Sequence, residues 1–212
     1  MGCSHPPAVK YNKKTHKDEN ILSSPINNQV KTTEHGKYVG PLKNGKMEGK
    51  GTFFWTNGDR YEGDYKNDKY EGKGIYYWNS GSRYEGDWKN DKKEGKGIYY
   101  YYKNDWRKRK KYEGDWIDNK REGKGIFYWN SGSRYEGEWK NDKKEGKGIL
   151  FFNTEPWKGD RYEGEWRNDK REGKGIEYYN NGDREMGDYS NGKQIGKHVT
   201  LTKNGEVKTN NY

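Results

Sequence analysis

Apolar and polar residues alternate with a period of two over most of the chain. In the sequence Tyr-Glu-Gly-Asp-Trp at 84–88, the Tyr, Gly and Trp fall on one side of an extended chain and the two acids fall on the other. A turn-forming segment at 90–93 follows, and the alternation resumes over 95–101, which is rich in aromatic residues. This pattern predicts two β-strands joined by a tight turn.

The predicted hairpin is repeated along the chain. Tyr-Glu-Gly recurs at a spacing of 23 residues, lengthened to 28 and 27 residues where two insertions occur, and Glu-Gly-Lys-Gly recurs in step with it. Asn-Gly or Asn-Ser-Gly-Ser segments, as at 79–82, turn the chain from one hairpin into the next. No apolar stripe with helical spacing accompanies the repeat, which argues against helices.

We therefore predict an all-β fold, an elongated single-layer antiparallel meander of about seven β-hairpins. The array is expected to span residues 38–207, between a flexible, disordered amino-terminal segment at 1–37 and a short tail at 208–212. At about 4.8 Å per strand, the ribbon would be roughly 65 Å long. The repeats begin near residues 38, 61, 84, 112, 135, 162 and 185.

Composition changes the expected core. Leu, Ile, Val and Phe number only 23 of 212 residues, whereas there are 20 Tyr, 9 Trp and 30 Gly. Rings are therefore expected to lie over glycines of paired strands and to form a thin aromatic layer. Because the second strand is apolar on both faces, part of this layer should stay exposed as an aromatic groove. Its predicted residues are Trp55, Tyr61, Tyr76, Trp78, Tyr84, Trp88, Tyr99, Tyr101, Tyr112, Trp116, Phe127, Trp129, Tyr135, Trp139, Tyr162 and Trp166.

Several classes of protein are excluded. No apolar run approaches the roughly 20 residues of a membrane-spanning helix, and no secretory signal is present, so a cytoplasmic protein is expected. The single cysteine and four scattered histidines indicate neither a disulfide nor a metal site. Gly-Lys-Gly lacks the spacing of a phosphate-binding loop, and no catalytic set of side chains stands out, so we expect no cofactor and no enzymatic activity.

The net charge of +10 is concentrated outside the repeats. Within the array, lysines such as Lys96 are expected to pair with acids on neighbouring strands, and this balance argues against nucleic-acid binding. A basic cluster beside aromatic residues is typical of contact with anionic lipid, such as a phosphoinositide, or with an acidic partner; a solvated charged turn is the alternative. The cluster consists of Arg107, Lys108, Arg109, Lys110 and Lys111.

The amino terminus contains a second candidate membrane contact. Myristoylation of Gly2 and palmitoylation of Cys3, followed by lysines, would form an anchor with two signals. Pro6 occupies the position that the myristoylation motif fills with Ser or Thr, so an unmodified tail is the alternative.

The repeat resembles the MORN repeat (membrane occupation and recognition nexus) over residues 38–207. The resemblance rests on the order of its motifs at a 23-residue spacing: Tyr-Glu-Gly-(Asp/Glu)-(Trp/Tyr), then Glu-Gly-Lys-Gly, then an Asn/Gly turn. The resemblance implies an elongated hairpin ribbon without catalysis of its own. In some members the array binds anionic lipid, in others it holds a partner helix or peptide in an aromatic groove, and some dimerise through terminal repeats.

We therefore expect a non-catalytic scaffold that docks a protein partner along the aromatic groove and associates with a membrane or the cortical cytoskeleton. A homodimer through the terminal repeats is a further implication of the resemblance. The alternative is a structural protein of the cilium or axoneme, similar to the radial-spoke members of the family, without a lipid role.

Overall fold

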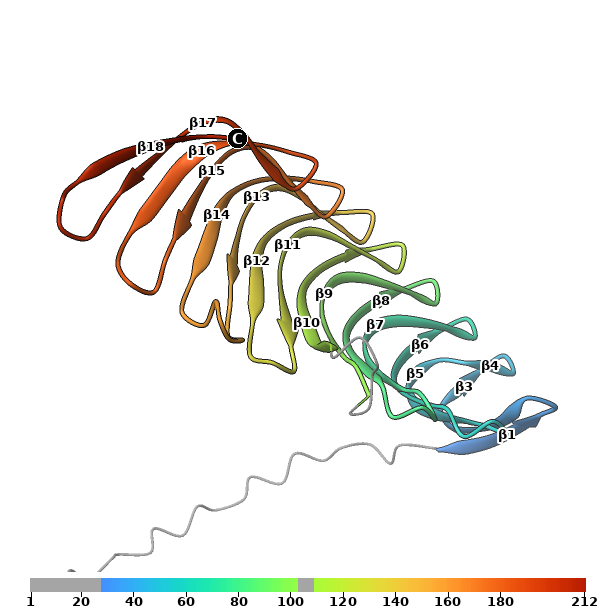
Figure 1. Ribbon diagram of the computed structural model, residues 1–212. Helices are drawn as coiled ribbons and strands as arrows, with labels where there is room; N and C mark the ends of the chain where they lie inside the picture. Colours follow the sequence, from blue (N-terminus) through green and yellow to red (C-terminus); the bar gives the residue numbers. More distant parts are fainter. Residues whose placement is uncertain (1–27, 103–108) are drawn as a thin grey trace, which may run out of the picture.

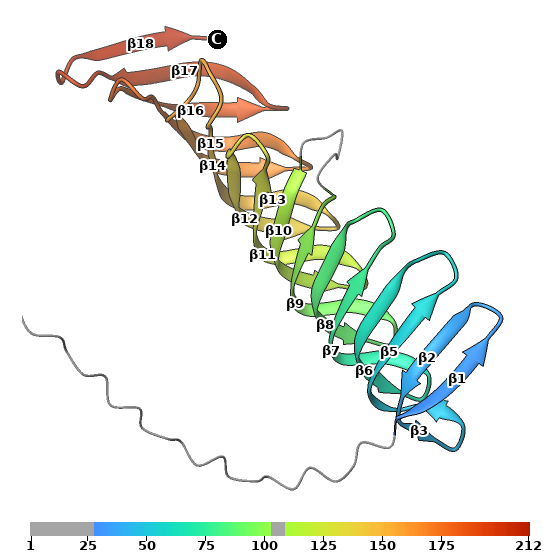
Figure 2. The same ribbon diagram turned by 90° about the horizontal axis from the view of Figure 1, so that it is seen from below.

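The computed structural model describes residues 28–102 and 109–212, and over these residues the chain forms β-strands and no helix. Sixteen strands form one open antiparallel sheet, and the hairpins succeed one another along a single axis from β1 to β18 (Figure 1). The view in Figure 2 shows the same elongated ribbon from below. The predicted all-β meander is therefore confirmed.

The strands are β1 (Gln29–Thr33), β2 (Gly36–Gly40), β3 (Leu42–Lys43), β4 (Lys46–Met47), β5 (Gly49–Trp55), β6 (Arg60–Lys66), β7 (Lys69–Tyr77), β8 (Arg83–Lys89), β9 (Lys92–Tyr100), β10 (Arg109–Ile117), β11 (Lys120–Trp129), β12 (Arg134–Lys140), β13 (Lys143–Phe151), β14 (Arg161–Arg167), β15 (Lys170–Tyr178), β16 (Arg184–Ser190), β17 (Lys193–Leu201) and β18 (Val207–Asn211).

One strand is added at each end of the predicted array. Residues 29–33, expected in the flexible segment, form β1 and pair with β2, while β18 reaches into the expected tail and pairs with β17. Neither strand has the ring pattern of the repeats, so side-chain contacts supplement the main-chain pairing. Lys31 Nζ lies 3.1 Å from Asp68 Oδ1, and Asn210 donates to Glu185 at 3.1 Å.

Each hairpin closes at a two-residue turn that also binds the preceding hairpin. Asn90 and Asp91 have φ values of 48° and 65°, as a type I′ turn requires, and this turn matches the twist of the flanking strands. Asp91 Oδ1 accepts the N–H of Tyr70 at 2.8 Å, and Asn90 donates its N–H to Glu71 at 3.1 Å. The turn and the Glu of Glu-Gly-Lys-Gly therefore hold successive repeats together.

A bulge at Glu-Gly-Lys-Gly interrupts the pairing within each hairpin. The register of β8 and β9 shifts after Gly86, and Gly95 in the bulge has a φ of 62°, a conformation that favours glycine. Asp87 Oδ2 accepts the N–H of Lys96 at 3.0 Å. The acid after Tyr-Glu-Gly thus satisfies a main-chain donor that the bulge leaves without a strand partner.

The core is a row of tyrosine rings that lie on paired glycines. Tyr84 covers Gly86 and Gly97, which face each other in adjacent strands, and its hydroxyl donates to the carbonyl of Asp87 at 3.0 Å. A Cβ atom at Gly97 would lie 2.3 Å from the Tyr84 oxygen, so the ring needs glycine beneath it. The equivalent rings are all fully buried: Tyr38, Tyr61, Tyr84, Tyr112, Tyr135 and Tyr162.

A second ring in each repeat connects these tyrosines. Trp116 is edge-on to Tyr112 in its own repeat and to Tyr84 in the preceding repeat, with centroid separations of 5.2 and 5.4 Å. Its Nε1 donates to the carbonyl of Gly97 at 3.2 Å. Edge-to-face pairs contribute about 0.5–1.5 kcal/mol each beyond burial. The core is therefore shared between repeats rather than enclosed within one.

Candidate functional site

A groove runs along the face opposite the tyrosine row. Along one side isoleucine and glutamate alternate from strand to strand, as where Ile98 lies between Glu85 and Glu113, and along the other side is a row of lysines. The groove has a volume of about 2310 Å³ and extends from Val39 in β2 to Val199 in β17, about 60 Å at the usual strand spacing. Pockets for small ligands occupy about 300–1,000 Å³, so this groove suits an elongated ligand.

The predicted aromatic residues do not line this groove in the described part of the chain, because strand alternation directs them to the other face. Ten of them are buried in the core: Tyr61, Tyr84, Trp88, Tyr112, Trp116, Phe127, Tyr135, Trp139, Tyr162 and Trp166. Six pack against the core and keep some exposed surface: Trp55, Tyr76, Trp78, Tyr99, Tyr101 and Trp129. Of the sixteen predicted residues, these six keep ring surface that a partner could contact.

Charges along the groove are paired across strands. The predicted lysine–acid pairs are confirmed for Lys50 with Asp64 at 2.8 Å, Lys73 with Asp87 at 2.5 Å, Lys174 with Asp188 at 3.4 Å, and Lys96 with Asp115. Exposed pairs of this kind contribute about 0–1 kcal/mol. A ligand that replaces one of these charges therefore disturbs the array little.

An arginine–aromatic row, which the sequence analysis did not predict, follows the glutamate side of the groove. Its contacts join Arg60 to Tyr77 at 4.2 Å, Arg83 to Tyr100 at 4.3 Å, Arg134 to Phe151 at 3.8 Å and Arg161 to Tyr178 at 3.8 Å, each from guanidinium to ring centroid. In the sequence, this row is indicated by the arginine directly before Tyr-Glu-Gly, which pairs with an aromatic residue near the end of the adjacent strand.

The predicted basic cluster is divided between environments. Arg107 and Lys108 lie outside the described residues, as do Gly2 and Cys3. Arg109 lies over the ring of Tyr101 at 4.2 Å, and Lys111 binds Glu113 at 2.9 Å. Lys110 is exposed. Because β10 has a register shift between Arg109 and Lys111, these two side chains lie in different environments, and the described part of the cluster does not form one cationic patch.

The described segments contain no helix of the length and apolar character that would span a bilayer.

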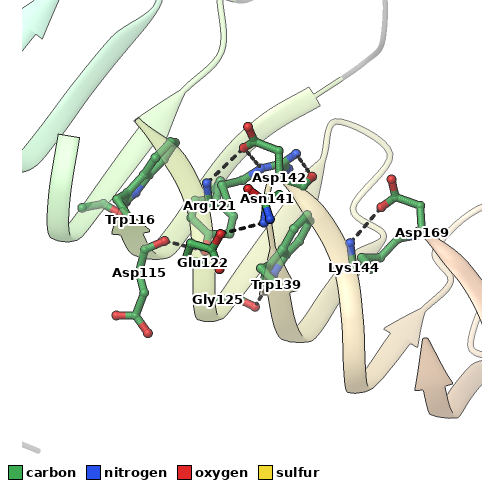
Figure 3. Close-up of polar contacts among 12 residues, drawn as sticks. Asp115, Trp116, Arg121, Glu122, Gly125, Trp139, Asn141, Asp142, Lys144 and Asp169 are labelled. Atoms are coloured by element: carbon green, nitrogen blue, oxygen red, sulfur yellow. Dashed lines mark hydrogen bonds and ion pairs between the residues drawn. The ribbon is translucent and has the colours of Figure 1, made fainter. Parts of the chain in front are cut away.

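A cation row covers the rings on the tyrosine face, with one residue directly before each of four Glu-Gly-Lys-Gly segments. Arg121 lies 4.3 Å from the Trp139 ring centroid, and its Nε donates to Asp142 Oδ1 at 3.0 Å (Figure 3). In the next repeat, Lys144 Nζ lies 4.3 Å from the Trp166 ring. The cation row consists of Lys93, Arg121, Lys144 and Arg171.

Lys93 has the most unusual environment in the cation row. Its Nζ lies 4.4 Å from the Trp116 ring and 4.9 Å from the Tyr99 ring. Burial lowers the pKa of Lys93 from 10.5 to about 8, and the nearby charge of Arg121 acts in the same direction while that of Asp142 opposes it. The environment of Lys93 could not be predicted from the repeat pattern, because the register of this lysine with the rings depends on the bulge.

The lowered pKa of Lys93 predicts a pH-dependent difference in stability between the wild type and Lys93→Met. Between about pH 8 and 10.5, the folded chain has released a proton that the unfolded chain still binds, so this group makes the folded state more stable as pH rises. We expect the wild type to gain stability relative to Lys93→Met from pH 7 to pH 10. Urea unfolding at both pH values measures this, and an unchanged difference would contradict it.

The comparisons with known proteins agree with the repeat pattern. The family model described as MORN repeat matches residues 38–60, 61–83, 84–106, 112–134, 135–154 and 162–184. No curated protein sequence matches the chain.

Solved structures with low sequence identity resemble the sheet. One is the SAS-4 (dCPAP) TCP domain of Drosophila melanogaster in complex with a proline-rich motif of Ana2 (dSTIL), with 11% identity and a TM-score of 0.49 over 98% of this chain and 99% of that chain. Another is the TCP10 domain of Danio rerio CPAP in complex with a STIL peptide, with 14% identity and a TM-score of 0.47 over 86% of this chain and 82% of that chain. The family model covers more than half of the chain, and its matched repeats coincide with successive hairpins, so the chain belongs to the MORN repeat family.

Proposed function

We propose that this chain is a non-catalytic scaffold that holds an elongated segment of a partner protein, a helix or an extended peptide, in the groove on the Ile–Glu face. The continuity of the groove from Val39 to Val199 is the observation that carries the proposal. A small molecule would contact one or two repeats, whereas a protein segment can contact most of them.

The chemistry of the groove supports a protein ligand. Five successive repeats each provide a partly buried isoleucine, such as Ile98 or Ile126, together with a glutamate and a lysine, and the set recurs about every 10 Å. Apolar contacts supply affinity, and the paired charges along the rims can exchange with charges of the ligand at small cost. Many modest contacts in series then add up along the array.

A groove variant tests the proposal. In a pull-down from its native cells, the double variant Ile98→Arg/Ile126→Arg is expected to lose the proteins that the wild-type chain retains, because two charges replace apolar side chains on the isoleucine side of the groove. Ile117→Arg is the matched control, since Ile117 is 54% exposed and lies outside the groove. Circular dichroism checks that the fold is kept.

Hydrogen exchange of a purified complex supplies the second part of this test. We expect partner-dependent protection of strands β9 and β11, which carry Ile98 and Ile126. Retention of the same partners by the groove variant, or protection confined to other strands, would contradict the proposal.

Association with a membrane or the cytoskeleton is a narrower proposal that rests on the family resemblance. The described part of the basic cluster supports lipid contact less strongly than the groove supports a protein partner, because Lys111 is already paired with Glu113. Cosedimentation of the wild type and of Lys110→Ser with phosphoinositide vesicles tests the contribution of the exposed lysine to lipid binding. Equal sedimentation of the two proteins would show that Lys110 does not contribute.

A further inference from the structure

On the tyrosine face, the ammonium of Lys93 has no ion-paired acid within the described residues, and Asp142, the acid whose charge reaches it, is bound to Arg121. The ammonium of Lys93 has three N–H donors, yet its Nζ has no hydrogen bond or ion pair in the described part of the chain. Trp116 and Tyr99 attract the charge through their ring faces, but they do not replace the hydrogen-bond acceptors that water provides.

Lys93 differs from Arg121 and Lys144 in the turn residue that accepts its main-chain N–H, which belongs to the next repeat. The main-chain N–H groups of Arg121 and Lys144 donate to Asp142 and Asp169, which places a carboxylate near each residue. For Lys93 the same acceptor is the neutral amide oxygen of Asn119, at 2.9 Å. The Nζ of Lys144, like that of Lys93, has no ion pair among the described residues, but the charge of Asp169 opposes the lowering of the Lys144 pKa by burial.

The other nearby acids are already engaged. Asp118 lies next to Asn119 in the turn, but its carboxylate binds Lys92 Nζ at 2.7 Å. Asp142, the acid whose charge reaches Lys93, is held by the side chain of Arg121. The repeat that contains Lys93 therefore has a cation with free donors among the described residues, and the acid whose charge reaches it is shared with Arg121.

We propose that Lys93 is a binding site for a carboxylate on an acidic segment of a partner protein. Lys93 is recessed between rings, so a flat membrane surface cannot approach it closely. The slender side chain of a glutamate or aspartate can, and its methylene groups would pack on the partly exposed ring of Trp78.

This site lies on the face opposite the Ile–Glu groove and does not depend on the proposed groove function. Binding of a carboxylate favours the charged form of the amine and so raises the pKa of Lys93 above its value of about 8 in the free chain. The pKa of one assigned lysine thus reports occupancy directly.

The test uses the full chain and a blocked deca-glutamate peptide as the probe. Nuclear magnetic resonance of the lysine side chains, with Lys93→Arg for assignment, follows the Lys93 signals as peptide is added. We expect a saturable shift and a raised pKa. Peptide affinity should fall at least tenfold in Lys93→Met and in Asn119→Asp, where an internal carboxylate competes with the peptide.

Two controls separate this site from general charge attraction. Lys144→Met removes the same charge from a lysine that has Asp169 beside it, and it should change the affinity less than twofold. Ile98→Arg/Ile126→Arg alters only the groove and should leave the Lys93 shift intact.

Two results would overturn the assignment. One is unchanged peptide affinity in both Lys93→Met and Asn119→Asp. The other is a Lys93 shift with inorganic phosphate or phosphatidylserine vesicles that equals the shift with peptide, which would assign the site to phosphate or lipid instead.

Discussion

Replacing Tyr112 with alanine is expected to lower the free energy of unfolding by about 3–5 kcal/mol, the usual cost of removing a large buried ring. Tyr112 is fully buried and lies edge-on to Trp116 and Trp139, with centroid separations of 5.2 and 5.3 Å. Its hydroxyl also donates to the carbonyl of Asp115 at 3.1 Å. Because the ring belongs to the cores of two repeats, its loss weakens the centre of the array.

Tyr100→Ala is the matched control for this prediction. Tyr100 lies in the same sheet on the opposite face, where it is only partly buried and contacts Arg83 at 4.3 Å. Its removal should cost about 1 kcal/mol, in the range of a single cross-strand pair. Urea unfolding followed by circular dichroism measures both variants. Similar losses in the two would show that stability does not come from the tyrosine row.

The final repeat exchanges the positions of ring and glycine. Glu185 stands where the other repeats have the core tyrosine, and His198 stands where they have the second glycine. The His198 ring lies over Gly187, is fully buried, and binds the carbonyl of Asp188 through Nε2 at 2.9 Å. A ring from the opposite strand therefore fills the space that tyrosine fills elsewhere.

The carboxylate of Glu185 has acquired a different role in this repeat. It accepts hydrogen bonds from Tyr179 at 2.8 Å, and from Asn210 and Tyr212 at 3.1 Å each. The last two residues belong to β18 and the chain end that follows it. The exchange thus tethers the last strand while keeping the ring row continuous.

We expect Glu185→Tyr and His198→Gly to be strongly coupled. His198→Gly alone removes a buried ring, at about 2–5 kcal/mol. Glu185→Tyr alone places a second ring where His198 already lies, at about 1–3 kcal/mol, and leaves Asn210 without its acceptor.

The double variant restores a tyrosine over two glycines, so its loss should be smaller than the sum of the single losses by about 0.5–3 kcal/mol. A double-mutant cycle in urea measures the coupling. Additive losses would show that the histidine does not replace the tyrosine ring.

Much of the fold could be predicted because its determinants are local. Alternation with a period of two defines the strands, and Asn-Asp and glycine positions allow the positive φ values of the turns and bulges. Rings over glycines also follow from this alternation, since Tyr84 and Gly86 share one face of a strand. The ladder of lysine–acid pairs follows from the same register.

The candidate surfaces could be predicted only in part. Arg109 and Lys111 are neighbours of Lys110 in sequence, but the strand places them in different environments, so a run of charges did not become a surface patch. Tyr84 and Trp116 were expected in a groove and are buried, because rings from adjacent repeats cover them.

The sequence by itself determined the hairpin repeat, its antiparallel order and the pairing of aromatic residues with glycine, because these depend on residues a few positions apart. Only the tertiary structure decided that the groove lies on the face opposite the rings and that Lys93 faces Asn119 rather than an aspartate. Those relations join residues of different repeats, and their register is fixed by the bulges and the contacts between hairpins.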